Sequence, residues 1–207
     1  MSVLCCQITR GMAPAISVAS VVTQCMKRGL CYELISGKPA AVAKNTAAQM
    51  AVERDMDLLL VEDDIIAKDS IWDAACDQSE ARPPIVIGTC LMKNGMLNTW
   101  FAEDRVLYSG TVFLRVRLSA LHAIGAPWFE CHDLTFVDNK WTDLGKRDHG
   151  MHSDAWFYYR AWMANLPVTV AGFVLHILHE YNTNRCELVT PNQLRVMGLP
   201  DCNKVSV

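Results

Sequence analysis

Three consecutive carboxylates directly follow an apolar run in the segment Met56–Ile65, and they are the strongest candidates in this chain for binding a metal ion. The run Leu58-Leu59-Leu60-Val61 predicts a buried strand that ends in Glu62, Asp63 and Asp64. Neighbouring side chains of a strand point to opposite faces, so Glu62 and Asp64 project together while Asp63 points the other way. Two carboxylates on one side suit a hard divalent cation such as Mn²⁺ or Mg²⁺. This pattern indicates metal-assisted chemistry on a phosphorylated substrate.

The elements before these acids alternate between strand-like and helix-like segments. We expect, in order, a strand, a helix, a strand, a helix and a strand over Val3–Ile8, Pro14–Arg28, Cys31–Ser36, Ala40–Arg54 and Asp57–Val61. This order predicts an α/β fold with a Rossmann-like, mostly parallel central sheet flanked by helices. Ligand sites in such sheets lie at the carboxyl ends of the strands, which is where the three acids fall.

The second half of the chain is less regular. We first expect a helix that runs to Asp77, capped by Asp69 or Ser70, and then a strand over Ile85–Ile87 and a hairpin over Leu91–Trp100 that turns at Asn94-Gly95. A strand over Ser109–Arg115 and a helix over Leu118–Ile124, ended by Gly125, should follow. The last expected elements are a helix from Ser153 to about Asn165 and an apolar run over Val168–Leu178. The stretch Glu130–His152 is polar and shows no apolar period, which predicts a long loop. Long loops in compact domains often act as lids.

The composition fits one domain, because 207 residues, about half of them apolar, supply one well-packed core. We expect a nucleotide-binding half over about 1–90, an acceptor-binding half over about 91–181 and a tail over 182–207. The net charge of -3 and the pI near 6.0 exclude a global basic field for nonspecific nucleic-acid binding. Nine scattered cysteines indicate reduced thiols and a cytoplasmic protein. No signal peptide or membrane span is expected.

Seven short features follow one another between Val3 and Tyr181, namely Thr9-Arg10-Gly11, Lys44-Asn45, Glu62-Asp63-Asp64, Ser109-Gly110-Thr111, Pro127-Trp128-Phe129, Ser153-Asp154 and His179. In this order they resemble the metal-dependent glycosyltransferases of the GT-A fold, broadly family 2-like, including small single-domain members from bacteriophages. The chain departs from that pattern at three positions. This chain has Lys44 where the family pattern has arginine, Glu62 where it has aspartate, and Ser153 where it has an acid.

The resemblance implies a metal site in which His179 joins Glu62 and Asp64, and His176 competes with His179 for this role. The cation would bridge the diphosphate of a nucleotide-sugar, with a UDP-sugar as the expected donor. Asp63 would contact the ribose or the donor sugar. A phage-encoded member would act in the host cytoplasm.

Further donor contacts are expected from Thr9, Arg10, Lys44, Asn45 and Gly110. Thr9 and Arg10 follow the first strand, where they would hold the base and phosphates. Lys44 and Asn45 would approach the diphosphate from the start of a helix. Gly110 would let a sugar come close to the backbone, or would mark a bulge.

The acceptor side is expected to involve Asp154, Trp128 and Phe129. At a helix start, an ionised Asp154 would accept the proton of the acceptor hydroxyl as catalytic base, or would orient the acceptor if configuration is retained. Trp128 and Phe129 would form an apolar platform for a ring. Each site also has a plainer interpretation. The acids would form a solvated turn, Asp154 would pair with its helix start, and the histidines and aromatics would belong to the core.

The acceptor itself is not defined by the sequence, and a modified DNA base or a glycan would each fit. Lys140, Lys146 and Arg147 offer a local basic contact for DNA. Two further functional classes stay open, a metal-dependent nucleotidyltransferase and a noncatalytic nucleotide-binding module. A zinc module is a weaker alternative, because its candidates lack paired Cys-x-x-Cys units. Those candidates are Cys131, His132, His149, His152 and the pair His176 and His179.

Overall fold

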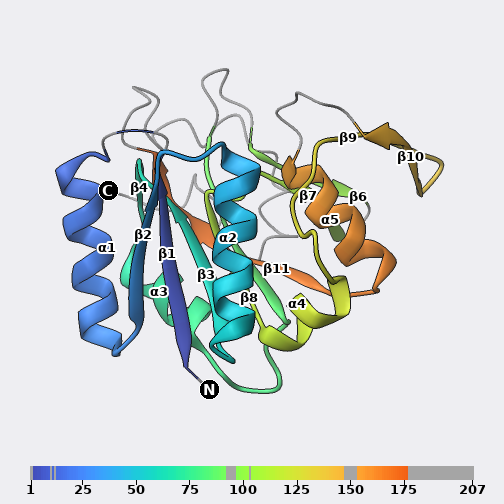
Figure 1. Ribbon diagram of the computed structural model, residues 1–207. Helices are drawn as coiled ribbons and strands as arrows, with labels where there is room; N and C mark the ends of the chain where they lie inside the picture. The colour runs from blue at the N-terminus through green and yellow to red at the C-terminus, as the bar shows by residue number, and fades with distance from the viewer. Residues whose placement is uncertain are drawn as a thin grey trace.

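The apolar run Leu58–Val61 forms the centre of a six-stranded sheet with the order β11-β5-β8-β3-β1-β2 (Figure 1). The computed structural model describes residues 2–9, 11, 13–91, 97–102, 104–146 and 153–176. Five strands run in one direction and β8 runs against them. The strands are β1 (Val3–Thr9), β2 (Cys31–Ser36), β3 (Asp57–Glu62), β5 (Ile85–Thr89), β8 (Phe113–Val116) and β11 (Val168–Phe173). The predicted α/β fold with a mostly parallel sheet is therefore confirmed.

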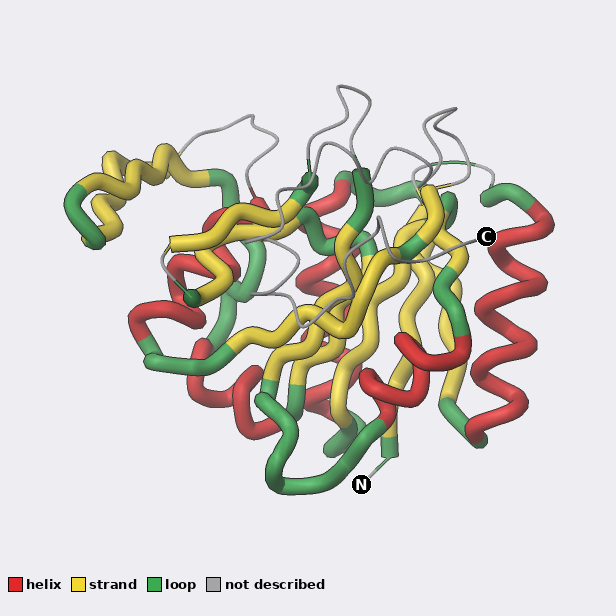
Figure 2. Tube along the Cα trace, turned by 180° about the vertical axis from the view of Figure 1, so that it is seen from behind, coloured by secondary structure: helices red, strands yellow, loops and turns green. Residues whose placement is uncertain are grey.

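Helices cover both faces of the sheet because each buried strand alternates its apolar side chains between them. Leu4, Cys6 and Ile8 of β1 face one core cluster, whereas Val3 and Cys5 face the other. The first cluster lies under α2, α4 and α5, and the second lies under α1 and α3, the side turned to the viewer in Figure 2. The helices are α1 (Ala15–Arg28), α2 (Ala40–Glu53), α3 (Asp69–Cys76), α4 (Leu118–Ile124) and α5 (Ser153–Met163).

The helix predictions agree with these bounds to within about two residues, and Gly125 terminates α4 as expected. The predicted cap of α3 is wrong. Its N-cap is Lys68, which makes no side-chain cap hydrogen bond. Asp69 lies inside the helix and instead accepts hydrogen bonds from Gln24 and Lys27 of α1. In the described part of the chain, no helix is long and apolar enough to cross a membrane.

Three two-stranded sheets surround the central one. They pair β4 (Ile65–Ile66) with β12 (Leu175–His176), β6 (Thr99–Ala102) with β7 (Arg105–Ser109), and β9 (His132–Val137) with β10 (Lys140–Lys146). Of the predicted hairpin over Leu91–Trp100, the turn lies outside the described residues. An antiparallel bridge joins Leu91 to Leu97 beside it.

The expected loop Glu130–His152 is a second correction, because most of it forms the β9–β10 hairpin that projects beyond α5 in Figure 1. The turn residues Asp138 and Asn139 both have positive φ, at 50° and 59°, as a tight hairpin turn requires. Phe136 of β9 packs edge-on against Trp162 of α5, which anchors the hairpin to the body. The stretch 147–152 lies outside the described residues.

The expected strand Ser109–Arg115 is two strands. β7 ends at Ser109 and β8 begins at Phe113. Between them the chain changes sheets, because the Gly110 N–H donates to Asn98 O while Val112 O accepts from the Glu62 N–H. This crossing brings Thr111 to the end of β3.

Candidate active site

The candidate site lies where β1 and β3 end and the antiparallel β8 begins, so all three contribute residues to one edge of the sheet. Glu62 is the last residue of β3, and its N–H donates to Val112 O over 2.9 Å. Thr9 is the last residue of β1. Its hydroxyl donates to Gly11 O and accepts from the Gly11 N–H, which forms a tight turn at the strand end. Arg10 lies outside the described residues.

Lys44 joins Glu62 to Asp154 across this edge. Its Nζ lies 2.7 Å from Asp154 Oδ1 and 3.5 Å from Glu62 Oε1. The side chain is 3% exposed. Burial lowers the pKa of Lys44, but the carboxylates of Asp154 and Glu62 raise it by more, so the pKa lies above its usual value. Lys44 is therefore a buried cation held by two acids of its own chain.

Asp154 lies in the first turn of α5, in the second half of the chain, and Thr111 fixes its orientation together with Lys44. The Thr111 hydroxyl donates to Asp154 Oδ1 over 2.9 Å, and the Thr111 N–H donates to Asp154 Oδ2 over 3.2 Å. The Asp154 side chain is 13% exposed. With three donors around it, the carboxylate has a defined direction. Thr111 stands in the motif Ser109-Gly110-Thr111, but no feature of the sequence predicts this role for it.

The expected position of Lys44 at a helix start needs correction. α2 begins at Ala40, so Lys44 lies in its second turn. Its ammonium group points to protein carboxylates. The residues Gly37-Lys38-Pro39 before the helix give no sign of this contact. The partner Asp154 is 110 residues away in sequence, so no local pattern could identify it.

Asn45, expected to contact the donor, instead anchors the chain after α4. Its Oδ1 accepts from the backbone N–H groups of Trp128 and Phe129, and its Nδ2 donates to Phe129 O. These three hydrogen bonds use most of the amide's capacity. The side chain is structural in this conformation, and the predicted donor contact is not supported.

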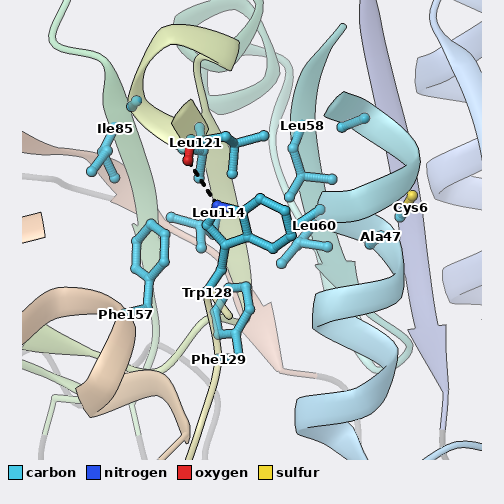
Figure 3. Packing of buried hydrophobic residues seen from close by; sticks show 14 of the residues in the cluster. Cys6, Ala47, Leu58, Leu60, Ile85, Leu114, Leu121, Trp128, Phe129 and Phe157 are labelled. Carbon is cyan, nitrogen blue, oxygen red and sulfur yellow. Dashed lines mark hydrogen bonds between the residues drawn. The ribbon is translucent and has the colours of Figure 1, made fainter. Parts of the chain in front are cut away.

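The predicted aromatic platform is wrong for a related reason. Trp128 and Phe129 are 5% and 1% exposed and belong to the core cluster shown in Figure 3. The Trp128 indole N–H donates to Leu121 O over 2.8 Å, and the Phe129 ring stacks on Phe157 at 5.1 Å. By binding the backbone of this segment, Asn45 holds both rings where no acceptor reaches their faces.

Gly110 also has a role other than sugar approach. A Cβ at this position would lie 3.0 Å from Asn98 Nδ2. Asn98 is fixed, since its Oδ1 accepts from Thr89 Oγ1, the Cys90 N–H and Thr99 Oγ1. Gly110 therefore makes room for Asn98. The sequence does not predict the buried Asn98 network, because isolated threonines and asparagines carry no periodic signal.

The chemistry of the acids suits a divalent cation. The pKa of Asp64 rises to about 6 because the carboxyl is buried and because Glu62 and Asp63 are negatively charged neighbours. A cation beside these acids would offset that repulsion. The described residues contain no group of three histidines, cysteines or acids that could hold a metal. The expected third ligand, His179, lies outside them.

The last described strand, β12, pairs with the strand that follows the acids. In the β4–β12 pair, His176 is the partner of Ile65, the residue that follows Asp64. His179 is three residues further along the chain. His179 lies outside the described residues, so its role as a ligand stays a prediction.

The zinc alternative finds no support in the described part of the chain. The Nδ1 of His132 lies 2.9 Å from Asp143, and its Nε2 lies 3.3 Å from Glu130. The ring also stacks on Trp156 at 3.8 Å. His132 thus ties the hairpin to α5. His149 and His152 lie outside the described residues.

No known family model and no curated protein match this sequence. Among solved structures, A197 from STIV has a TM-score of 0.57 and 14% identity, with 84% of this chain and 84% of that chain covered. A glycosyltransferase involved in the glycosylation of the major capsid of PBCV-1 has a TM-score of 0.40 and 13% identity, with 62% and 70% covered. The inositol-1-phosphate CTP transferase from T. maritima has a TM-score of 0.48 and 11% identity, with 94% and 94% covered. The likeness to A197 concerns the fold.

Proposed function

We propose that this chain is a metal-dependent glycosyltransferase that moves a sugar from a nucleotide-sugar, with UDP-sugars as the first donors to test. The observation that carries the proposal is the meeting of two acidic groups at one edge of the sheet. Glu62 is the last residue of the central strand β3, and Asp64 lies in the turn that follows it. Lys44 joins Glu62 to Asp154, which Thr111 also holds. The sequence motifs that resemble family 2-like enzymes contribute the same residues.

In this proposal Glu62, Asp64 and His179 are the residues that would hold Mn²⁺ or Mg²⁺. When bound, the cation supplies neutralisation of the charge that builds on the departing nucleoside diphosphate. Thr9 and Arg10, at the end of β1, would hold the nucleotide, and Asp63 would contact the ribose or the donor sugar.

Asp154 would take the proton of the acceptor hydroxyl. Its Oδ2 accepts only the Thr111 N–H among the hydrogen bonds described above, which leaves room for a hydroxyl donor. Lys44 and Thr111 supply the orientation that a general base needs, because proton transfer requires hydrogen-bond distance and alignment.

For the acceptor, we favour the hydroxyl of a glycan over a modified DNA base. Of the predicted basic contact, Lys146 forms an ion pair with Glu130, and Arg147 lies outside the described residues. Lys140 begins β10 and is exposed. The hairpin therefore presents less positive charge than its sequence suggests, and phosphate contacts dominate affinity for DNA.

Calorimetric titration of UDP and GDP, each with Mn²⁺ and with chelator, tests the donor site. We expect one diphosphate to bind only with metal, and Asp64→Asn to weaken this binding at least about tenfold, because it removes one charged ligand. The matched control is Asp55→Asn, which removes the same charge from the turn before β3 at the opposite edge of the sheet. Asparagine tolerates the positive φ of 54° at that position.

The same titration separates the alternatives. Metal-dependent binding of CTP or UTP without binding of either diphosphate would point to nucleotidyl transfer. Equal binding by wild type and Asp64→Asn would refute the metal site. Release of free sugar from a panel of UDP-sugars, measured without acceptor, then identifies the donor, because transferases hydrolyse their donors slowly.

A further inference from the structure

Lys44 occupies a position that a contact with the donor's diphosphate does not explain. It is a buried ammonium group in contact with one acid of the proposed metal site, Glu62, and with the proposed base, Asp154. A lysine that binds a diphosphate extends its Nζ into the ligand site. Here the shorter contact, 2.7 Å, is to Asp154, and the side chain is nearly inaccessible to solvent.

We propose that Lys44 is a positioning residue that acts as a fixed counterion between the donor and acceptor sides of the site, holding Asp154 next to Glu62 while keeping Asp154 out of the metal's coordination shell. This inference rests on the proposed function, because it takes Glu62 as a metal ligand and Asp154 as the base. It replaces the expectation that Lys44 binds the donor's diphosphate.

The charges at this edge explain why such a counterion is needed. Glu62 and Asp154 both lie within 3.5 Å of the same Nζ, so the two carboxylates are close neighbours. Two carboxylates on a common cation can also share a metal ion, since Mn²⁺ and Mg²⁺ accept several oxygen ligands. A carboxylate that coordinates the metal is a weaker base, because the cation favours its ionised form. Lys44 takes up the position from which a cation would bridge the two acids, and it carries one charge that cannot dissociate from the site.

Thr111 supports the same arrangement. Its hydroxyl and Lys44 Nζ both donate to Asp154 Oδ1, so this oxygen is fully engaged within the protein. Among the described residues, the Thr111 N–H is the donor to the Oδ2 atom. The two donors therefore present one defined oxygen to the acceptor.

The decisive measurement is the binding of Mn²⁺ alone, without nucleotide, detected by electron paramagnetic resonance and by calorimetry. For Lys44→Met we expect Mn²⁺ to bind about tenfold or more tightly, or a second Mn²⁺ to appear, because a nearby positive charge is removed and Asp154 becomes available as a ligand. Lys44→Arg keeps the charge, so its Mn²⁺ affinity should stay within about twofold of wild type. Lys38→Met is the matched control. It removes an exposed lysine just before α2, whose Nζ contacts only Thr46 among the described residues.

Two further readouts distinguish positioning from donor binding. Lys44→Met should lower kcat at least about a hundredfold while UDP binding in saturating Mn²⁺ changes less than about threefold, since the base is misplaced but the diphosphate is not. Lys44→Arg should recover metal affinity but little of kcat, because a planar guanidinium cannot reproduce the contact to Asp154. A large loss of UDP affinity in both variants would overturn the inference in favour of a diphosphate contact.

Lys44→Met leaves two acids without their cation, and such a change can prevent folding. The double variant Lys44→Met/Asp154→Asn removes the pair together and keeps the net charge. It should fold and bind one Mn²⁺ with wild-type affinity, whereas tighter binding by the double variant would contradict the role given to Asp154. If the wild type binds no Mn²⁺, the proposed function fails and the inference with it. If the wild type binds Mn²⁺ and Lys44→Met binds it equally well, only the inference fails.

Discussion

The ion pair between Asp57 and Arg115 should govern stability without affecting the candidate site. Both side chains are 0% exposed, and Arg115 Nη2 lies 2.7 Å from Asp57 Oδ2. The other oxygen of Asp57 accepts the N–H of Leu118, the first residue of α4, over 2.8 Å. Asp57 begins β3, at the edge of the sheet opposite to Glu62. Replacing Arg115 with methionine leaves a buried carboxylate without its counterion, which costs about 3–5 kcal/mol.

Arg115 does not use all of its hydrogen-bond donors, and this determines how much stability the double variant should lose. Arg115 Nε and Nη1 are buried and have no hydrogen-bond partner in the part of the chain that the structure describes. Burial also lowers the pKa of Arg115, although Asp57 counteracts it. In Asp57→Asn/Arg115→Met neither charge of this buried pair remains, and the asparagine oxygen still accepts from the Leu118 N–H. We therefore expect the double variant to lose less than about 2 kcal/mol.

Urea unfolding of wild type, both single variants and the double variant gives the free energies of this cycle. Mn²⁺-dependent UDP binding serves as the control and should be unchanged in every folded variant. The reasoning is refuted if Arg115→Met costs less than about 1 kcal/mol, or if the double variant loses the sum of the single losses.

Three further predictions concern other parts of the fold. Gly110→Ala should lower the free energy of unfolding, measured in urea, by about 1–2 kcal/mol, because its Cβ would press on the immobilised Asn98 amide. The same substitution should cost much less when it is made in an Asn98→Ala background, where that amide is absent. In native protein at pH 8, iodoacetamide should label the exposed Cys31 but spare Cys6, whose pKa burial raises to about 12, as peptide mass spectrometry would show. A hydrogen bond from Arg82 lowers the pKa of Asp77 to about 2. The stability that the Asp77–Arg82 pair contributes is therefore present above about pH 4 and is lost as the pH falls toward 2. The acid-unfolding curve of Asp77→Asn should therefore be flatter than that of wild type over this range.

The first half of the fold follows from the sequence because its signals are local. The alanine-rich segment of α2 and the apolar run of β3 each contain enough residues of one kind to specify an element. The order of these elements then specifies a parallel sheet. The acids that follow β3 could be placed at the carboxyl ends of the strands for the same reason.

The errors arise where a distant contact decides the structure. Lys44 has the pattern of a phosphate ligand until Asp154 is placed beside it. Trp128 and Phe129 resemble an exposed platform until Asn45 is seen to bind their backbone. In the β9–β10 hairpin the signal was local but was missed, because its Asp-Asn turn lies among other polar residues.

Lys44 and Asn45 are adjacent in α2, yet they bind segments that come from different parts of the chain, one before β9 and one at the start of α5. Successive residues of a helix point about 100° apart, so this separation in direction is set by the helix itself. An inserted or deleted residue between Pro39 and Lys44 would rotate both side chains by that angle and would detach both segments at once. The number of residues between Pro39 and Lys44 is therefore constrained as strictly as the identities of Lys44 and Asn45. Relatives of this chain should vary in length before Pro39 or after α2, and not between Pro39 and Lys44.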